Sequence, residues 1–442
     1  MKLLFFIYYL FFDKNQKKIK KTFKKKNIEN KKKEKMKEEN TISNININDT
    51  IQVYFDIEKS NVDAKVLQIK IDESTNKKLY YVHFLNLEKR MDKWVEQSLI
   101  QKNYGKIPNS IDGANLINHS MLNDNFVLTR KRSSLFSNGS YTENENEIEK
   151  TVKIKNVEKI ILGYYEINAW YFSPFPNEFT TNKILYICEK CLKYMKYKNT
   201  LIKHLQKCTF KNPPGKKIYD MKISSELSSS KKKDRISESI SVYEIKGSEN
   251  KLYCQNLCLI AKLFLDHKSI YFDVSPFKFY VLTENDKNGN HIVAYFSKEV
   301  NELSEYNLSC IMVLPPFQRK GYGQFLISLS YYLSNKQNKI CTPETPLSDL
   351  GKISYKSYWT ITILDALLKN KGNLCVKDLS EQTGIKPEDI TYTLNELSLI
   401  KYWKGQQVVQ NINIKQIEEF LNKKKASKKN HVKFNEMYII NN

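Results

Sequence analysis

The sequence predicts an α/β protein with two folded parts, a small β module followed by a larger mixed domain. Two observations carry this prediction. Short runs of alternating apolar and polar residues lie between Asp49 and Ile100, and a series of strand-like runs further on leads into a glycine turn and an apolar helix. The chain has 442 residues, which suits two or three domains, because single cores stop growing near roughly 250–300 residues.

Composition narrows the class of protein. A hydrophobic fraction of 41% with 28 Tyr and 22 Phe is enough to build cores and excludes wholesale disorder. Eight Cys are too few for a disulfide scaffold, and no stretch reaches the roughly 18–20 apolar residues of a membrane-spanning helix. The formal charge of +24 points to polyanionic partners: nucleic acid, chromatin or an acidic membrane surface.

Much of the charge lies in one N-terminal stretch. Residues 14–37 hold 13 Lys and two acids, so residues 1–45 are predicted to form a basic, low-complexity tail that stays solvated. The lysines are either a compositional habit of the sequence or an arm for nuclear import or nucleic-acid binding. The apolar stretch Met1–Phe12 ahead of them is too short to span a membrane, and no small-residue cleavage site follows it.

The β module is predicted over residues 46–104. Its expected strands are residues 51–55, 64–69, 79–84 and 93–95, which suit a small barrel. Its aromatic residues either form part of a methyl-lysine cage, because aromatic faces attract quaternary ammonium, or belong to the core; they are Tyr54, Tyr81, Phe84 and Trp94.

Polar segments separate or interrupt the folded parts. Residues 105–150 are rich in Asn, Ser and Glu and are predicted to be a linker. The polar stretch Ser224–Ser241 is predicted to be an insertion that forms a surface loop, and residues 423–442 return to Lys and Asn as a second basic tail.

Four metal-ligand side chains occur at zinc-finger spacing. Cys188-x2-Cys191 is followed twelve residues later by His204-x3-Cys208, and a helix over residues 197–207 would present the last two ligands one turn apart. Four protein ligands leave no open coordination position, so we expect one structural zinc per chain. The apolar face formed by Leu201 and Leu205 favours packing of this helix over contact with nucleic acid.

A strand, a glycine turn and a helix follow one another around residue 320. The apolar run Leu308–Leu314 precedes Pro315-Pro316 and Gln318–Gly323, and an apolar helix is predicted over Gln324–Ser334. This order of elements aims backbone N–H groups and a helix N-terminus at phosphate. A single G-x-G is weak on its own.

The preceding region supports an acyl-CoA-binding α/β domain. An apolar helix is predicted over Tyr253–Asp266, with strands at Ile270–Val274, Phe279–Leu282 and His291–Phe296. After the glycine turn, Glu344 lies between two prolines on a stiff segment. Helices are also predicted at residues 361–368, 376–383 and 388–399.

These segments resemble the MYST histone acetyltransferases in order and spacing over about residues 160–409. The resemblance is carried by LYICEKCLKYM, HLQKC, PPGKKIYD, YCQNLCLIAKLFLDHKSIYFDVSPFKFYVL, CIMVLPPFQRKGYGQFLISLSYYLS and PETPLSDLGKISYKSYW. KRMDKWV in the β module is similar to the chromo-barrel, or Tudor-knot, of the family's chromodomain-bearing branch. The implied fold is an acyl-CoA N-acyltransferase-like domain over residues 151–422, with a CCHC zinc finger at 184–210, an acetyl-CoA core at 250–350 and a winged-helix-like segment at 354–410.

The resemblance implies roles for three active-site residues. Glu344 matches the general base, which the chemistry requires because a free lysine amine is almost wholly protonated at neutral pH. Cys310 matches the active-site cysteine, which either accepts the acetyl group or lines the pocket for direct attack. Lys268 matches the autoacetylated lysine. Without the resemblance, Cys310 would be interpreted as a core thiol and Lys268 as a solvated lysine.

The resemblance also implies the acetyl-CoA contacts. The main chain that would meet the acyl and pantetheine portion is that of Ile311, Met312 and Val313. The loop that would cradle the pyrophosphate consists of Gln318, Arg319, Lys320, Gly321, Tyr322, Gly323 and Gln324. Two later contacts match Ser348 and Ser357.

The predicted function is that of a nuclear histone lysine acetyltransferase which acts on histone tails and nucleosomes, with the family branch implying histone four. The resemblance further implies a multiprotein acetyltransferase complex, and the basic arm and chromo-barrel are candidate DNA or RNA contacts. No membrane partner is expected. The alternative is a non-catalytic, zinc-containing chromatin or DNA reader that retains the fold.

Overall fold

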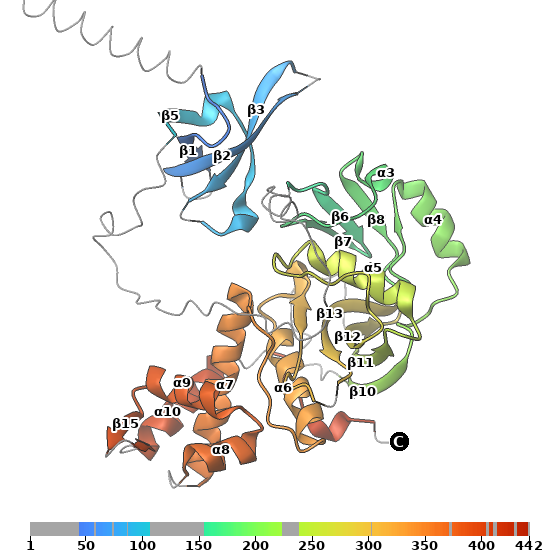
Figure 1. The fold of residues 1–442 in the computed structure, drawn as a ribbon. Coiled ribbons are helices and arrows are strands. Elements are labelled where there is room, and N and C mark those ends of the chain that lie inside the picture. Colours follow the sequence, from blue (N-terminus) through green and yellow to red (C-terminus); the bar gives the residue numbers. More distant parts are fainter. Residues whose placement is uncertain are drawn as a thin grey trace, which may run out of the picture. The chain divides into compact units, whose positions relative to one another are not determined.

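The chain folds into two compact units, residues 1–152 and 153–442, and each is described here by itself (Figure 1). The structure is a computed structural model that describes residues 44–56, 59–72, 75–85, 87–106, 154–222, 238–301, 303–370, 374–403, 406–409, 413–427 and 431–440. The basic arm before residue 44, Met1–Phe12, the expected linker beyond residue 106 and residues 224–237 of the expected insertion lie outside these ranges. No helix within them is long and apolar enough to cross a membrane.

The first unit is a five-stranded antiparallel sheet in the order β4-β3-β2-β1-β5. The four expected strands are confirmed, and a fifth, unexpected strand pairs with the first. The strands are β1 (Thr50–Phe55), β2 (Ser60–Asp72), β3 (Lys77–Phe84), β4 (Lys93–Glu96) and β5 (Ile100–Gly105). Alternate residues of these strands point inward, as in Ile51, Val53 and Phe55, and form one apolar core.

The four aromatic residues of this unit do not form one cage. Phe84 is fully buried and packs against Phe55 with ring centroids 4.8 Å apart, so it belongs to the core. Tyr81 and Trp94 are cross-strand partners, 5.3 Å apart, and the Lys70 ammonium lies 4.2 Å above the Trp94 ring. Tyr54 pairs with Asn61 of β2, whereas Tyr81 pairs with Gln68 of the same strand. These two partners are seven residues apart, about 20 Å along β2. The cage interpretation is therefore wrong for Phe84 and Tyr54.

The second unit is built on a five-stranded antiparallel sheet in the order β10-β11-β12-β13-β14. Its strands are β10 (Lys216–Lys222), β11 (Ser239–Lys246), β12 (Phe277–Asp286), β13 (Gly289–Glu299) and β14 (Cys310–Val313). The central strands are buried almost throughout, because the main core of the unit packs on them. Ser239–Ser241 lie in β11, so the polar insertion ends earlier than the sequence indicated.

Two helices predicted from apolar spacing are confirmed beside this sheet. They are α5 (Lys251–Lys262) and α6 (Tyr322–Asn335), and α6 packs against β13 and β14 (Figure 1). The predicted strand Ile270–Val274 is wrong. These residues form a loop in which Ile270 and Phe272 are 46% and 54% exposed, so their β-branched and aromatic character does not reflect burial in a sheet.

A smaller sheet carries the zinc-finger motif. Its order is β7-β6-β8-β9, with β6 (Lys159–Leu162) parallel to β8 (Ile184–Ile187). The other strands are β7 (Tyr165–Asn168) and β9 (Tyr194–Met195), and the short helix α3 (Asn177–Thr180) precedes β8. Helix α4 (Lys198–Lys207) follows β9 and contacts both β8 and β9.

The C-terminal part has the helices and hairpin of a winged-helix-like element. Helix α7 (Asp349–Lys369) begins earlier than expected because Ser348 caps its N-terminus, accepting a hydrogen bond from the Gly351 N–H at 3.1 Å. It is followed by α8 (Val376–Thr383), α9 (Pro387–Glu396), the hairpin β15 (Ile400–Trp403) and β16 (Gln406–Val409), and α10 (Ile414–Ser427).

The end of the chain differs from the loose basic tail expected after residue 422. Helix α10 continues to Ser427, and residues 431–440 pack back onto the domain. Phe434 stacks on the buried Tyr219 ring at 5.7 Å, and Ile439 forms a bridge with the same residue of β10. The lysines of this tail lie mainly at residues 423–429, whereas the apolar residues that pack on the domain lie at 431–440.

The core position of Phe84 can be tested by mutation. Phe84→Ala should destabilise the first unit by about 3–5 kcal/mol, because it leaves a cavity beside Phe55. Amide hydrogen exchange in β2 and β3 of the full chain would measure the loss of protection. Leu85→Ala is the matched control, since Leu85 is 48% exposed. Equal effects of the two substitutions would contradict the core assignment.

Candidate functional site

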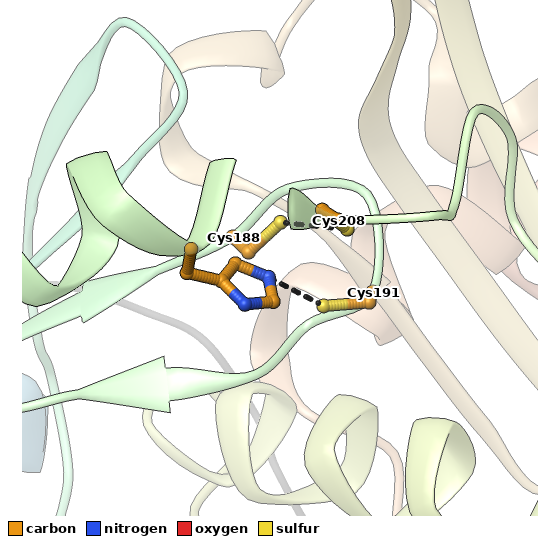
Figure 2. A group of neighbouring side chains, drawn as sticks. Cys188, Cys191 and Cys208 are labelled. Atoms are coloured by element: carbon orange, nitrogen blue, oxygen red, sulfur yellow. Dashed lines mark hydrogen bonds between the residues drawn. The ribbon is translucent and has the colours of Figure 1, made fainter. Parts of the chain in front are cut away.

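The four expected metal ligands come together. Within the described residues, the ligand atoms of Cys188, Cys191, His204 and Cys208 all lie within 4.8 Å of one another. Figure 2 shows the three cysteine side chains facing a common centre from the turn after β8 and the end of α4. The Cys188 and Cys208 sulfurs are 3.9 Å apart, and the Cys191 sulfur is 3.2 Å from Nε2 of His204.

This geometry suits zinc. A tetrahedral site with Zn–S bonds of about 2.3 Å and Zn–N bonds of about 2.0 Å needs ligand atoms at such separations. The hydrogen bond with Cys191 lowers the pKa of the Cys188 thiol to about 5 and raises that of Cys191, because the two thiols share one proton. All four coordination positions are protein side chains, so the zinc of this finger is structural.

The finger helix is less packed than its apolar face predicted. No residue of α4 is buried, Leu201 is half-buried, and Ile202 and Leu205 are 46% and 43% exposed. The expectation that Leu201 and Leu205 bury a packing face is therefore only partly met.

A side-chain bridge with no pairing signal in the sequence joins the finger to the central sheet. His291 on β13 is buried, with Nδ1 2.9 Å from the Glu189 carboxylate and Nε2 3.0 Å from that of Asp286. Glu189 lies between the first two zinc ligands, so the bridge ties the zinc knuckle to the β12–β13 turn. A carboxylate inside the C-x2-C motif and a histidine beside a hairpin turn were the available signals, but nothing in the sequence pairs them.

The glycine loop has the backbone of an anion-binding turn. Arg319 has φ 62° and Gly321, the N-cap of α6, has φ 98°, so two residues adopt the left-handed conformation just before the helix. The N-cap of α6 is a glycine and makes no side-chain hydrogen bond to the first turn, and a helix N-terminus favours anions.

The two glycines of the loop have different roles. A side chain at Gly321 would come within 2.6 Å of the Val432 carbonyl oxygen, so the C-terminal segment fills this space. Val432 also donates its N–H to the Lys320 carbonyl at 2.9 Å. A Cβ at Gly323 would lie 3.8 Å from Val313 and from Ser354, which is an ordinary van der Waals distance, so this glycine packs beside β14 without a steric demand like that at Gly321.

Several other residues matched to acetyl-CoA contacts lie on β14 or on the glycine loop. β14 pairs with β13 through residues 310–313 and with no second strand of the described residues. Gln318 donates to the Val313 carbonyl at 3.0 Å, and Gln324 donates to the Ser357 hydroxyl at 2.9 Å. The loop is also anchored from inside, since the Tyr322 phenol donates to the buried Glu284 carboxylate. This last contact joins residues 38 apart and had no sequence signal.

Cys310 and Lys268 are brought together at the start of β14. The Lys268 Nζ lies 3.6 Å from the Cys310 sulfur, and Cys258 of α5 also faces it. Burial alone would lower the pKa of Lys268, but the sulfurs of Cys310 and Cys258 outweigh burial and raise it. The expectation of a solvated lysine, formed without the resemblance, is therefore wrong, since Lys268 is 9% exposed.

Glu344 lies on a segment that runs beside the chain leading into β14. Its N–H donates to the Leu308 carbonyl at 3.0 Å, two residues before Cys310. Its side chain is half-buried. The structure therefore places the backbone of Glu344 near the start of β14, where Cys310 and Lys268 meet.

Removal of one zinc ligand should unfold the finger. The wild-type chain should hold about one zinc, and Cys188→Ser should lose it together with a lower unfolding temperature, because metal binding and folding are coupled. Metal analysis and thermal unfolding measure both effects. Cys375→Ser is the control, because Cys375 is exposed and lies outside the cluster. A Cys188→Ser protein with wild-type unfolding and no metal would contradict the structural role.

Comparison with known proteins agrees with this geometry. Residues 212–439 match the MOZ/SAS family, residues 154–208 the MYST family zinc finger domain, and residues 47–102 the Tudor-knot, described as the RNA binding activity-knot of a chromodomain.

Several curated proteins are similar over most of the chain. Histone acetyltransferase of the MYST family 1 from Arabidopsis thaliana is 44% identical over 338 residues, which cover 75% of this chain and 71% of that protein. The Histone acetyltransferase Tip60 homolog of Caenorhabditis elegans is 40% identical over 367 residues, covering 75% and 77%. Histone acetyltransferase MOF of Drosophila melanogaster is 50% identical over 268 residues, covering 60% and 30%. This chain therefore belongs to the MOZ/SAS family, with a MYST zinc finger and a Tudor-knot chromo-barrel.

Proposed function

We propose that this chain is a histone lysine acetyltransferase that moves an acetyl group from acetyl-CoA to the ε-amine of lysine. The observation that carries the proposal is the arrangement along β14. Cys310 and Lys268 meet at its start, and the glycine loop follows its end. The relatives named as histone acetyltransferases support the same activity. A non-catalytic reader would need neither the loop nor the buried pair.

The loop and strand hold acetyl-CoA in this proposal. The N–H groups at the start of α6 and the backbone around Gly321 face the pyrophosphate, and Arg319 and Lys320 add positive charge. The main chain of residues 311–313 lies along the pantetheine, at the edge of β14 that pairs with no other strand of the described residues. Ser357 is joined to the loop by its hydrogen bond from Gln324, whereas the hydroxyl of Ser348 caps α7.

Glu344 is the proposed general base. A substrate lysine is a nucleophile only after its ammonium loses a proton, and a positioned carboxylate accepts that proton. The neutral amine then attacks the thioester carbonyl, the C–N bond forms, and the C–S bond to coenzyme A breaks with release of the thiol. Lys268 is the proposed autoacetylation site. Its raised pKa keeps it an ammonium, so its own acetylation needs the same deprotonation.

Cys310 takes one of two roles. In direct transfer its thiol lines the pocket, and in the alternative it accepts the acetyl group first and passes it to the amine. Acetylation kinetics of Cys310→Ala separate the two routes, because direct transfer survives the substitution and an acetyl-enzyme route does not.

Nucleosomes are the proposed substrate, with the tail of histone four as the preferred target and the nucleus as the place of action. The Tudor-knot is a proposed DNA or RNA contact, supported by the family description and by the lysines beside its aromatic residues. We also propose that the chain works within a multiprotein acetyltransferase complex.

The general-base role predicts the effect of one isosteric change. Glu344→Gln should lower the rate of nucleosome acetylation by about 10²–10⁴-fold at neutral pH, because the amide cannot accept the proton. Acetyl-CoA binding should be unchanged, since the loop lies on other elements. Mass spectrometry of acetyl-lysines measures the rate. Glu381→Gln, an exposed carboxylate on α8, is the control. Full activity of Glu344→Gln would overturn the assignment.

A further inference from the structure

The segment that carries Glu344 is held between two other parts of the chain. On one side, Thr342 donates to the Glu305 carbonyl and accepts from the Asn307 N–H, both at 3.0 Å. On the other side, Cys341 donates to the Gly384 carbonyl at 2.8 Å and accepts from the Lys386 N–H at 3.2 Å. The first side leads into β14, and the second leads directly into α9. The base-bearing segment is therefore also a backbone partner of the winged-helix-like element.

A side-chain contact reinforces this attachment. Asp389, in the first turn of α9, accepts a hydrogen bond from the Thr342 side chain. Its second oxygen, Oδ2, is buried and has no hydrogen-bond partner among the described residues. At the rim of the same junction, Lys386 forms an ion pair with Glu305. The Asp389 contact thus reaches Thr342 itself. The ion pair of Lys386 with Glu305 joins the two segments between which Thr342 is held.

The environment of Asp389 disfavours its charge. Burial raises the pKa of Asp389 to about 6, against the smaller opposing effect of the Thr342 hydrogen bond. The charged groups near it are Glu388 and Lys386 on its own side, and the buried hydroxyls of Tyr331 and Tyr355 face it from α6 and α7. Buried polar groups normally have hydrogen-bond partners, so a buried carboxylate with one unpaired oxygen lowers stability. Such a group at Asp389 suggests a role other than stabilisation.

We propose that Asp389 is a positioning residue for the acetyl-transfer reaction. It fixes Thr342, and through this residue it sets the position of Glu344 two residues further along the hydrogen-bonded segment. The winged-helix-like element thereby takes part in catalysis without touching the substrate. This inference rests on the proposed role of Glu344.

The test uses the full chain with acetyl-CoA and nucleosomes. Asp389→Ala and Thr342→Val should each lower kcat by about 10- to 100-fold, because a base displaced by about 1 Å is inefficient. The KM for acetyl-CoA should stay unchanged, since the cofactor loop lies elsewhere. The double variant should be no slower than either single variant, because both remove one interaction.

Conservative variants supply the rescue. Thr342→Ser keeps the hydroxyl donor and should restore kcat. Asp389→Asn keeps an oxygen acceptor and should retain most of it. Asp389→Asn should also raise the unfolding temperature at pH 7.5, and this gain should shrink as the pH is lowered from about 6 to about 4. Burial raises the folded-state pKa of Asp389 above the ordinary carboxyl value, so between these two pKa values only the unfolded state loses its proton and stability falls as the pH rises.

Asp378→Ala is the matched control. Asp378 closes the capping box of α8 by accepting from the Cys375 N–H at 3.0 Å, so its loss weakens the same element at an exposed site away from residues 341–344. It should keep wild-type kcat. Multiplicative losses in the double variant, or an equal fall in Asp378→Ala, would overturn the proposal. If Glu344→Gln is inactive while Asp389→Ala has normal kcat, only the positioning role fails; if Glu344→Gln is fully active, the base assignment itself fails.

Discussion

The pairing of β14 with β13 is the constraint on which the site depends. Four residues of a short edge strand hold Cys310 at one end and lead to the glycine loop after the other. The buried residues of β12 and β13 fix the position of this strand, because their side chains fill the core on which the sheet rests. The free edge of β14 then leaves backbone groups for a ligand, while the paired edge keeps them in register.

The zinc finger contributes to the same framework from a distance. Its metal ligands fix the turn that carries Glu189. His291 contacts both Glu189 and Asp286, so the β12–β13 hairpin is attached to this turn. A structural metal can thus support an acetyl-transfer site without any contact with the reacting atoms.

Most of the fold could be predicted from the sequence, because hydrophobic periodicity marks strands and helices locally. Four of the five strands of the first unit, helices α4, α5 and α6 and the four zinc ligands followed from spacing alone. The pattern failed at Ile270–Val274, where exposed apolar residues mimic a strand, and at residues 431–440, which the lysines at 423–429 assign to a basic tail although they carry apolar packing residues. The contacts of Tyr322 with Glu284 and of Asp389 with Thr342 join residues far apart, and no local pattern specifies such pairs.

The contact between Val432 and the glycine loop has a consequence for how the domain is completed. More than a hundred residues separate Lys320 from the N–H that its carbonyl accepts, and Gly321 is shaped to receive that same segment. During synthesis the loop emerges long before its backbone partner, and closing so long a connection carries an entropic cost that local contacts avoid. The glycine loop therefore reaches its final conformation only after the winged-helix-like element and α10 have been made, which makes this loop one of the last parts of the domain to mature.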